Sequence, residues 1–462
     1  MAKKTFKIGI TMAGAISAGA YTAGVMDYLL ETIDKWYKAK GSDPSIPAHD
    51  IEIQILSGAS AGGMTAAITA AAIKNKIPHI TVDKRTDEDY KKGNILYNSW
   101  VNLTGENMMQ QMLQNDDIDS KGAISLLNSD FIDEVAGRSL QIDKENIISR
   151  DYFAEQPQIF MTLSSINGIP YKIRFESYDG SQDFLTIKHS DIAHFRLNEK
   201  EYKNDGRIPL SFEDDVNVEL LGEAAKATGA FPVGLASRKV LREKKWMQQN
   251  PWINPAAGTV FEEIDIQDPF DALTIDGGMI ENEPFTLTRQ MLLEQLQESE
   301  AENSDADKFN GTVLMIDPFP SGEYKPPEDD SRLLAKIIPR IFSTMRKQLL
   351  FHPDDIKTAY NEKDYSRFLI APKRVEKMGE AAIACGSLGG FGGFFDIEFR
   401  RHDFFLGRRN CQLFLRRYFA VPTDTQNPIF KEGYSSPEAR ERFLIERGDN
   451  KFLPLIPDPG YV

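Results

Sequence analysis

The chain contains little cysteine and no long apolar run. Its 462 residues include two cysteines, Cys385 and Cys411, and neither lies in a CxxC motif or a Cys/His cluster. This excludes a disulfide framework and gives no zinc-binding pattern. The longest stretch of small apolar residues, 61–73, is shorter than the roughly 20 residues that a membrane-spanning helix needs. The N-terminal segment lacks a signal-peptide core, so we expect a reduced, cytoplasmic protein.

Basic residues are also scarce relative to acidic ones. The chain has 54 Lys and Arg against 69 Asp and Glu, a formal charge of -15 and a sequence pI near 5.1. Nucleic-acid binding requires a concentrated basic face, so we expect no nucleic-acid partner. Apolar residues make up 41% of the chain, which is ample for a sizeable core. A folded enzyme is therefore expected, and no residue pattern requires a metal or an organic cofactor.

The spacing of apolar residues predicts an α/β fold. Residues 6–11 and 51–56 alternate like strands, and residues 20–37 and 61–74 follow them as helices. This order predicts a three-layer sandwich, in which helices cover both faces of a mostly parallel sheet. Further strands are expected at 158–164, 171–176, 184–187, 273–275 and 312–316, and further helices at 218–228, 285–298 and 333–350. We expect a catalytic domain over 1–325, with a helical insertion at about 80–150, and a mainly helical C-terminal region over 326–462.

A serine lies at the junction of the second expected strand and its helix, in Gly58-Ala59-Ser60-Ala61-Gly62. A GxSxG motif in this setting typically holds a nucleophilic serine in a sharp, exposed turn. The helix that follows also offers free backbone N–H groups near a developing oxyanion. The alternative is a glycine-rich turn with a bystander serine.

Activating Ser60 requires a base within hydrogen-bond reach. The chain has six histidines, and His402 best fits the Ser…Asp…His order of α/β-hydrolases. The better candidate is Asp276, in Leu273-Thr-Ile-Asp276-Gly277-Gly278, because it ends a short strand and is expected at the same sheet edge as Ser60. A carboxylate can act as a general base when it is held close to the hydroxyl. The alternative for Asp276 is an ordinary strand-end turn.

Three separated blocks resemble those of the patatin-like phospholipases, lipid acyl hydrolases that use a Ser–Asp dyad and no catalytic histidine. They are residues 58–62, residues 276–278 with Asn282 and Pro284 downstream, and residues 14–24. Residues 224–232 are similar to the helix and turn before the family's aspartate strand, and the likeness runs from about residue 6 to 320. The resemblance implies Ser60 as nucleophile and Asp276 as base. It also implies motif support from Gly58, Gly62, Gly277 and Gly278, and an oxyanion hole at Gly14, Ala15 and Ile16.

One block departs from the family pattern. Where the family has three glycines and then a basic residue two positions on, this chain has Gly14-Ala15-Ile16-Ser17-Ala18-Gly19. Backbone N–H groups of Ala15 and Ile16 can still donate provided that φ is negative, because a positive φ is costly for a β-branched residue. Ala18 removes a positive charge near the site. The loop is either altered but working, or a cause of lost activity.

The resemblance implies a serine acyl hydrolase that cleaves lipid carboxylic esters, of phospholipase, lysophospholipase or lipase type. The substrate is then a lipid ester, and Ser60 forms an acyl-enzyme that water releases. Two alternatives stay open. One is a catalytically impaired scaffold that binds lipid or protein, and the other is an acyltransferase or thioesterase with the same dyad.

The segment 366–419 differs in charge from the rest of the chain. It has ten Lys and Arg against five Asp and Glu, together with a glycine-rich run at 386–393 and several phenylalanines. Such a segment is consistent with peripheral contact with anionic lipid headgroups. The alternative is a helix pair with aromatic side chains in the core and arginines extending outward. The glycine run lacks the GK[ST] ending of a phosphate-binding loop.

Overall fold

A computed structural model describes residues 5–84, 86–103, 108–118, 122–178, 180–254, 266–299, 305–320 and 365–460. Within these ranges, nine strands form one sheet, in the order β5-β4-β3-β2-β1-β8-β9, with β7 paired to β3 and β6 paired to β7. The strands are β1 (Thr5–Met12), β2 (Asp50–Gly58), β3 (Phe153–Ser177), β4 (Gly180–Leu197), β5 (Ile208–Leu210), β6 (Arg238–Arg242), β7 (Phe270–Asp276), β8 (Gly311–Ile316) and β9 (Arg367–Ile370).

The centre of the sheet is parallel. β1 pairs in parallel with β2 and β8, β2 with β3, and β8 with β9, whereas β4 and β7 run antiparallel to β3. Parallel central strands are covered on both faces, which explains the continuous apolar composition of β8, Gly-Thr-Val-Leu-Met-Ile. The predicted mostly parallel sheet is confirmed.

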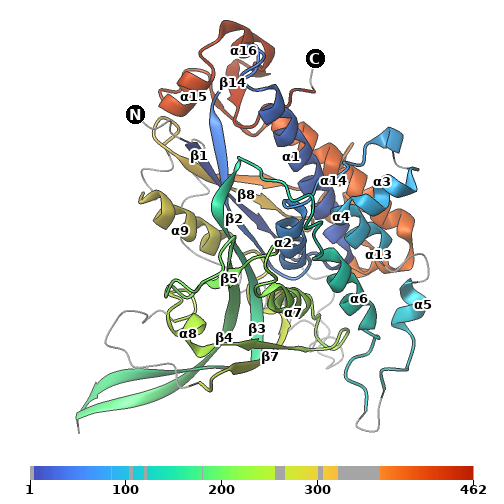
Figure 1. Ribbon diagram of the computed structural model, residues 1–462, viewed down its shortest axis with the longest axis vertical. Helices are drawn as coiled ribbons and strands as arrows, with labels where there is room; N and C mark the ends of the chain where they lie inside the picture. Colours follow the sequence, from blue (N-terminus) through green and yellow to red (C-terminus); the bar gives the residue numbers. More distant parts are fainter. Residues whose placement is uncertain are drawn as a thin grey trace, which may run out of the picture.

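Helices cover both faces of the sheet. Val313 packs in a core cluster with Met291 and Leu292 of α9 (Phe285–Leu296), and its neighbour Leu314 belongs to the larger cluster shared with α1 (Gly19–Ala39) and α2 (Ala61–Ala72). Because adjacent strand residues point to opposite faces, α9 lies on the other side of the sheet from α1 and α2. Figure 1 shows this three-layer arrangement, which confirms the predicted fold class.

The predicted insertion contains short helices separated by loops. They are α3 (Glu88–Gly93), α4 (Ile95–Tyr97), a π-helix (Asn98–Asn102), α5 (Met108–Met112) and α6 (Asp130–Ser139). The strands expected at 158–164 and 171–176 are one long strand, β3, which forms a hairpin with β4 that projects from the body of the molecule (Figure 1). Helices α7 (Val218–Thr228) and α8 (Lys244–Gln248) follow.

The region after residue 364 packs against the same sheet and helices. Strand β9 extends the sheet, and α14 (Ile397–Arg417) lies along α1, as Figure 1 shows. The two helices approach closely at glycines: a Cβ on Gly24 would lie 1.9 Å from the carbonyl oxygen of Phe404, and one on Gly407 would lie 2.1 Å from that of Tyr21. The predicted division at residues 325 and 326 and the predicted helix at 333–350 lie outside the described residues.

This region also contains strands that the sequence did not predict. A hairpin of β10 (Lys373–Arg374) and β11 (Lys377–Met378) precedes α13 (Gly392–Phe395) and α14. A second sheet has three strands, in the order β12 (Ala420–Pro422), β14 (Asn450–Pro454) and β13 (Ile445–Arg447). In the sequence, α15 (Pro428–Gly433) and α16 (Pro437–Arg442) lie between β12 and β13. Among the described helices, none combines the length and apolarity needed to cross a membrane.

The register of the sheet brings two distant residues to one edge. Strand β3 pairs through Met161 with Gly58, the last residue of β2, and through Leu163 with Asp276, the last residue of β7. Although β7 is antiparallel to β3, it therefore ends beside the point where β2 ends. This register places Ser60 and Asp276 next to each other.

Candidate active site

Ser60 lies in the turn between β2 and α2, with φ 50° and ψ -127°. Neighbouring glycines permit this turn: a Cβ on Gly62 would lie 2.0 Å from the carbonyl oxygen of Met12, and one on Gly58 would lie 2.4 Å from the backbone of Gly62. The Ser60 N–H donates a hydrogen bond of 2.8 Å to the hydroxyl of Thr228, at the end of α7. The strained backbone of Ser60 is therefore held by the close packing at Gly58 and Gly62 and by the hydrogen bond to Thr228.

Asp276 is positioned by hydrogen bonds at both carboxylate oxygens. Its Oδ2 lies 2.7 Å from Ser60 Oγ, and its Oδ1 accepts the backbone N–H of Gly278 at 2.7 Å. Its own N–H donates to the carbonyl oxygen of Ala230 at 2.9 Å. Ser60 and Asp276 are 6% and 5% exposed, so the pair lies in a site that is nearly closed to solvent. Asp276 therefore caps a turn and, through its other oxygen, contacts the serine.

His402 is engaged elsewhere. Its Nδ1 lies 2.7 Å from Asp403 and its Nε2 lies 3.1 Å from Arg374. The structure therefore places a carboxylate, and not this histidine, at Ser60.

The oxyanion loop differs from the prediction at two of its three residues. The Gly14 N–H donates to the carbonyl oxygen of Asn282 at 3.1 Å and is already engaged. The condition of a negative φ is met at Ala15, with a φ of -145°, and is not met at Ile16, with a φ of 48°. The N–H groups of Ala15 and Ile16 have no hydrogen-bond acceptor among the described residues, and the same holds for Ala61 at the start of α2.

Asn282 explains why this part of the loop keeps its glycine. Its side-chain oxygen occupies the space that a side chain at position 14 or 278 would need. A Cβ on Gly14 would be 2.3 Å from Asn282 Oδ1, and a Cβ on Gly278 would be 2.5 Å from it. Asn282 thus joins the loop before α1 to the turn after Asp276. The sequence signal for this role was its place downstream of Asp276.

An apolar cavity of about 60 Å³ adjoins the serine and the aspartate. Its wall comes from seven stretches of the chain: the loop before α1, the start of α2, the segment 100–103, α6, the turn after α7, the end of β7 and the segment 391–394. The lining residues are Ile16, Ser60, Ala61, Met64, Trp100, Leu103, Phe131, Ile132, Gly229, Phe231, Leu235, Asp276, Phe391 and Phe394. The sequence did not place Trp100, Phe391 or Phe394 at this site. The glycine-rich run at 386–393, considered above for lipid or phosphate contact, borders the cavity at Phe391.

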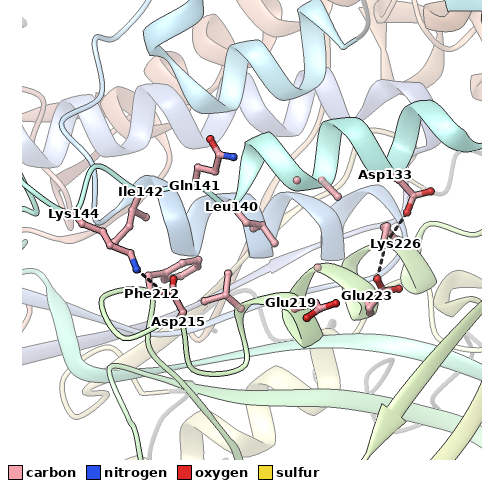
Figure 2. A pocket seen from close by; sticks show the side chains of 14 residues that line it. Asp133, Leu140, Gln141, Ile142, Lys144, Phe212, Asp215, Glu219, Glu223 and Lys226 are labelled. Atoms are coloured by element: carbon pink, nitrogen blue, oxygen red, sulfur yellow. Dashed lines mark hydrogen bonds and ion pairs between the residues drawn. The ribbon is translucent and has the colours of Figure 1, made fainter.

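A larger cavity of about 510 Å³ lies between α6 and α7 (Figure 2). Five of its six charged side chains pair with one another: Lys144 with Asp215 at 2.5 Å, and Lys226 with Asp133 and Glu223 at 2.6 Å each. Its lining contains no serine, cysteine or histidine, so it offers no nucleophile. In the described part of the chain, His, Cys, Asp and Glu side chains form no group of three that could hold a metal ion.

Comparison with known proteins agrees with this geometry. The family model "Patatin-like phospholipase" matches residues 10–289, which include both Ser60 and Asp276. The chain belongs to the patatin-like phospholipase family. This patatin-like protein is also similar to an uncharacterized protein, y4iI, of Sinorhizobium fredii (strain NBRC 101917 / NGR234). The two are 32% identical over an alignment that covers 99% of this chain and 71% of the relative.

Proposed function

We propose that this patatin-like protein is a serine hydrolase that cleaves carboxylic esters of lipids through Ser60 and Asp276. The observation that carries the proposal is the 2.7 Å contact between Ser60 Oγ and Asp276 Oδ2 beside an apolar cavity. A hydroxyl is a weak nucleophile, and a carboxylate at this distance can accept its proton during attack. The apolar wall suits the hydrocarbon part of an acyl ester.

The proposed reaction proceeds in two steps. Ser60 Oγ attacks the ester carbonyl while Asp276 takes its proton, and the alcohol leaves with that proton as the acyl-enzyme forms. Asp276 then takes a proton from water, whose oxygen attacks the acyl-enzyme, and Ser60 leaves with the proton. The carboxylate is regenerated at the end of each step. The N–H groups of Ala15, Ile16 and Ala61, which have no acceptor among the described residues, are the proposed oxyanion donors. The positive φ of Ile16 costs backbone energy but leaves its N–H available to donate. The Gly14 N–H is engaged by Asn282 and is not a donor in this proposal.

The size of the cavity implies movement during binding. At about 60 Å³ it is far smaller than the roughly 300–1,000 Å³ of typical ligand pockets. Trp100, Phe391 and Phe394 are large side chains in its wall, and we propose that some of them move aside when an acyl chain enters.

Substituting the dyad tests the proposal. We expect Asp276→Asn to reduce kcat by about 10²- to 10⁴-fold, because asparagine keeps the shape and the bond from Gly278 but cannot take a proton. Hydrolysis should be measured across phospholipids, lysophospholipids, glycerides and short acyl esters, with Ser60→Ala as the background. Full activity of Asp276→Asn would reject the aspartate as base.

A fluorophosphonate probe separates the alternatives. Stoichiometric labelling of the wild-type chain, absent from Ser60→Ala, is expected, because labelling needs an activated serine. An unlabelled, folded chain would indicate a scaffold without catalysis. Transfer of the acyl group to an added alcohol in place of water would indicate an acyltransferase.

We also propose peripheral membrane contact, at the β10–β11 hairpin. Residues 373–378 are all exposed, with Val375 at 88% and Met378 at 67%, and they include the basic residues Lys373, Arg374 and Lys377. By contrast, Phe404, Phe414 and Phe419 of the same segment are buried. The expectation of outward-reaching arginines holds only in part, because Arg400 and Arg408 are buried as well.

A further inference from the structure

Ile16 occupies an unfavourable backbone conformation at the edge of the active site. Its φ of 48° lies in the left-handed region, where a branched Cβ crowds the backbone. Such a conformation costs roughly 1–3 kcal/mol and persists only where the surrounding structure holds it. Ile16 also lines the cavity beside Ser60. Some contact of this loop therefore opposes the strain.

Ser17, the next residue of the loop, is hydrogen-bonded to the glycine-rich segment. Its hydroxyl, which is 1% exposed, donates to the carbonyl oxygen of Gly390 at 2.5 Å and accepts the N–H of Gly393 at 3.0 Å. Gly390 has a φ of 99°, and a Cβ there would lie 3.2 Å from the end of the Ile16 side chain. The glycine-rich segment thus lies against the loop, and it both accepts a hydrogen bond from the Ser17 hydroxyl and donates one to it.

That segment is itself anchored to α14. Buried Arg400 donates to the carbonyl oxygen of Gly393 and, at 2.8 Å, to that of Val101. The carboxylate of Asp403 accepts the N–H groups of Ala384 and Cys385 at 2.8 Å each. The loop beside Ser60 is therefore connected to a long helix through the glycine-rich segment.

We propose that Ser17 is a positioning residue, which holds Ala15 and Ile16 so that their N–H groups face the ester oxygen in the transition state. This inference rests on the proposed hydrolase function. Glycine adopts a positive φ without strain, whereas a loop with alanine and isoleucine needs an external constraint. The C-terminal segment 384–393 supplies that constraint through Ser17.

Kinetics of Ser17→Ala test this role. Loss of one oxyanion donor costs about 10²- to 10³-fold in kcat, and a displaced loop should cost about 10- to 100-fold with KM within about twofold. Affinity for a long-chain trifluoromethyl ketone, whose adduct carries the oxyanion, should fall in parallel. Ser387→Ala is the matched control, because Ser387 is exposed in the same segment and donates to Ala384 instead. An unchanged kcat, or a raised KM alone, would reject the role.

Gly393→Ala breaks the same contact from the other side, because its Cβ would lie 2.7 Å from Ser17 Oγ and 2.6 Å from Cys385 Sγ. We expect the same kinetic change as for Ser17→Ala. A crystal structure of Ser17→Ala gives a test that needs no activity: Ile16 should relax to a negative φ. An Ile16 that keeps its φ would overturn the inference even in an active hydrolase. If the wild-type protein hydrolyses no ester, the proposed function fails, and the crystal structure still decides what holds the loop.

Discussion

At the scale of single residues, the site combines two strained backbones with hydrogen bonds that hold them. Ser60 and Ile16 both have positive φ. The Ser60 N–H donates to the hydroxyl of Thr228, and the hydroxyl of Ser17, next to Ile16, binds Gly390 and Gly393. Strain of this kind is stable only when its supports are intact. Removing one hydroxyl should therefore affect geometry more than it affects the fold.

Thr228→Val removes the acceptor of the Ser60 N–H while keeping the shape of the side chain. A buried N–H without a partner costs about 1–3 kcal/mol, so the free energy of unfolding should fall by that amount. We also expect kcat to fall by about tenfold or more, because Ser60 no longer has a fixed position relative to Asp276. Urea denaturation and ester hydrolysis measure the two effects. Thr228→Ser keeps the acceptor and serves as the control; equal behaviour of valine and serine variants would contradict the prediction.

The proximity of Ser60 and Asp276 could be predicted because each lies at the end of a strand within a local motif. The oxyanion loop could not, because its geometry depends on partners far away in the sequence. Asn282 accepts the Gly14 N–H, and Gly390 and Gly393 bind Ser17. No local pattern in residues 14–19 indicates these partners. Backbone angles in such a loop are set by tertiary contacts.

At the scale of elements, buried strands and helices were predictable and edge strands were not. β8 is buried along most of its length and ends in four apolar residues, which give a clear signal. β9 (Arg367–Ile370) is short and only partly buried at the edge of the sheet, so its sequence carries no clear period. The close packing of α1 on α14 likewise depends on Gly24 facing the backbone of Phe404 and Gly407 facing that of Tyr21, residues far apart in the sequence.

A buried charge cluster joins α1 to α14. Arg408 of α14 forms ion pairs with Asp27 and Glu31 of α1, and His79 Nδ1 lies 2.9 Å from Asp27. Breaking a buried pair by removing one partner costs about 3–5 kcal/mol, so this cluster ties the two helices together. Asp34 of α1 also faces His79 and bonds Arg150.

His79 makes this cluster sensitive to pH. Burial disfavours the charged ring, but the hydrogen bond that His79 donates to Asp27 and the nearby carboxylate of Asp34 outweigh burial and raise the pKa of His79 to about 9. A raised pKa stabilises the fold fully below the unfolded value of about 6.5, and this stability is lost as pH rises through 9. The free energy of unfolding should fall by at most about 3 kcal/mol over this window.

His79→Gln should flatten that fall and lower stability below pH 7. Urea denaturation between pH 6 and 10 measures both. His189→Gln is the matched control, because the ring of His189 bonds the carbonyl oxygen of Ser165 and lies outside this cluster. A His79→Gln curve parallel to that of the wild type would show that His79 does not cause the pH dependence.

At the scale of the whole molecule, three segments far apart in the sequence meet beside Ser60. Trp100 comes from the insertion, Phe131 from α6 and Phe394 from the C-terminal region. The sequence predicted that such apolar side chains would form a core. It did not predict that these three would line one cavity, because that depends on how distant segments pack in the folded chain. Net charge is another whole-molecule property, and -15 opposes approach to an anionic membrane.

The membrane contact proposed at the β10–β11 hairpin therefore requires a local positive charge that acts against the net charge. Each Lys or Arg near an anionic surface contributes about 1 kcal/mol, so removing two in Lys373→Gln/Lys377→Gln should weaken binding by about 2 kcal/mol, or about 30-fold. Sedimentation with phosphatidylserine-containing vesicles measures this change, which should shrink at high salt and vanish with phosphatidylcholine alone. Lys38→Gln/Lys431→Gln, at two exposed lysines outside the segment, removes the same charge and should leave binding nearly unchanged. Equal losses in both double variants would show that overall charge, and not the hairpin, governs contact with lipid.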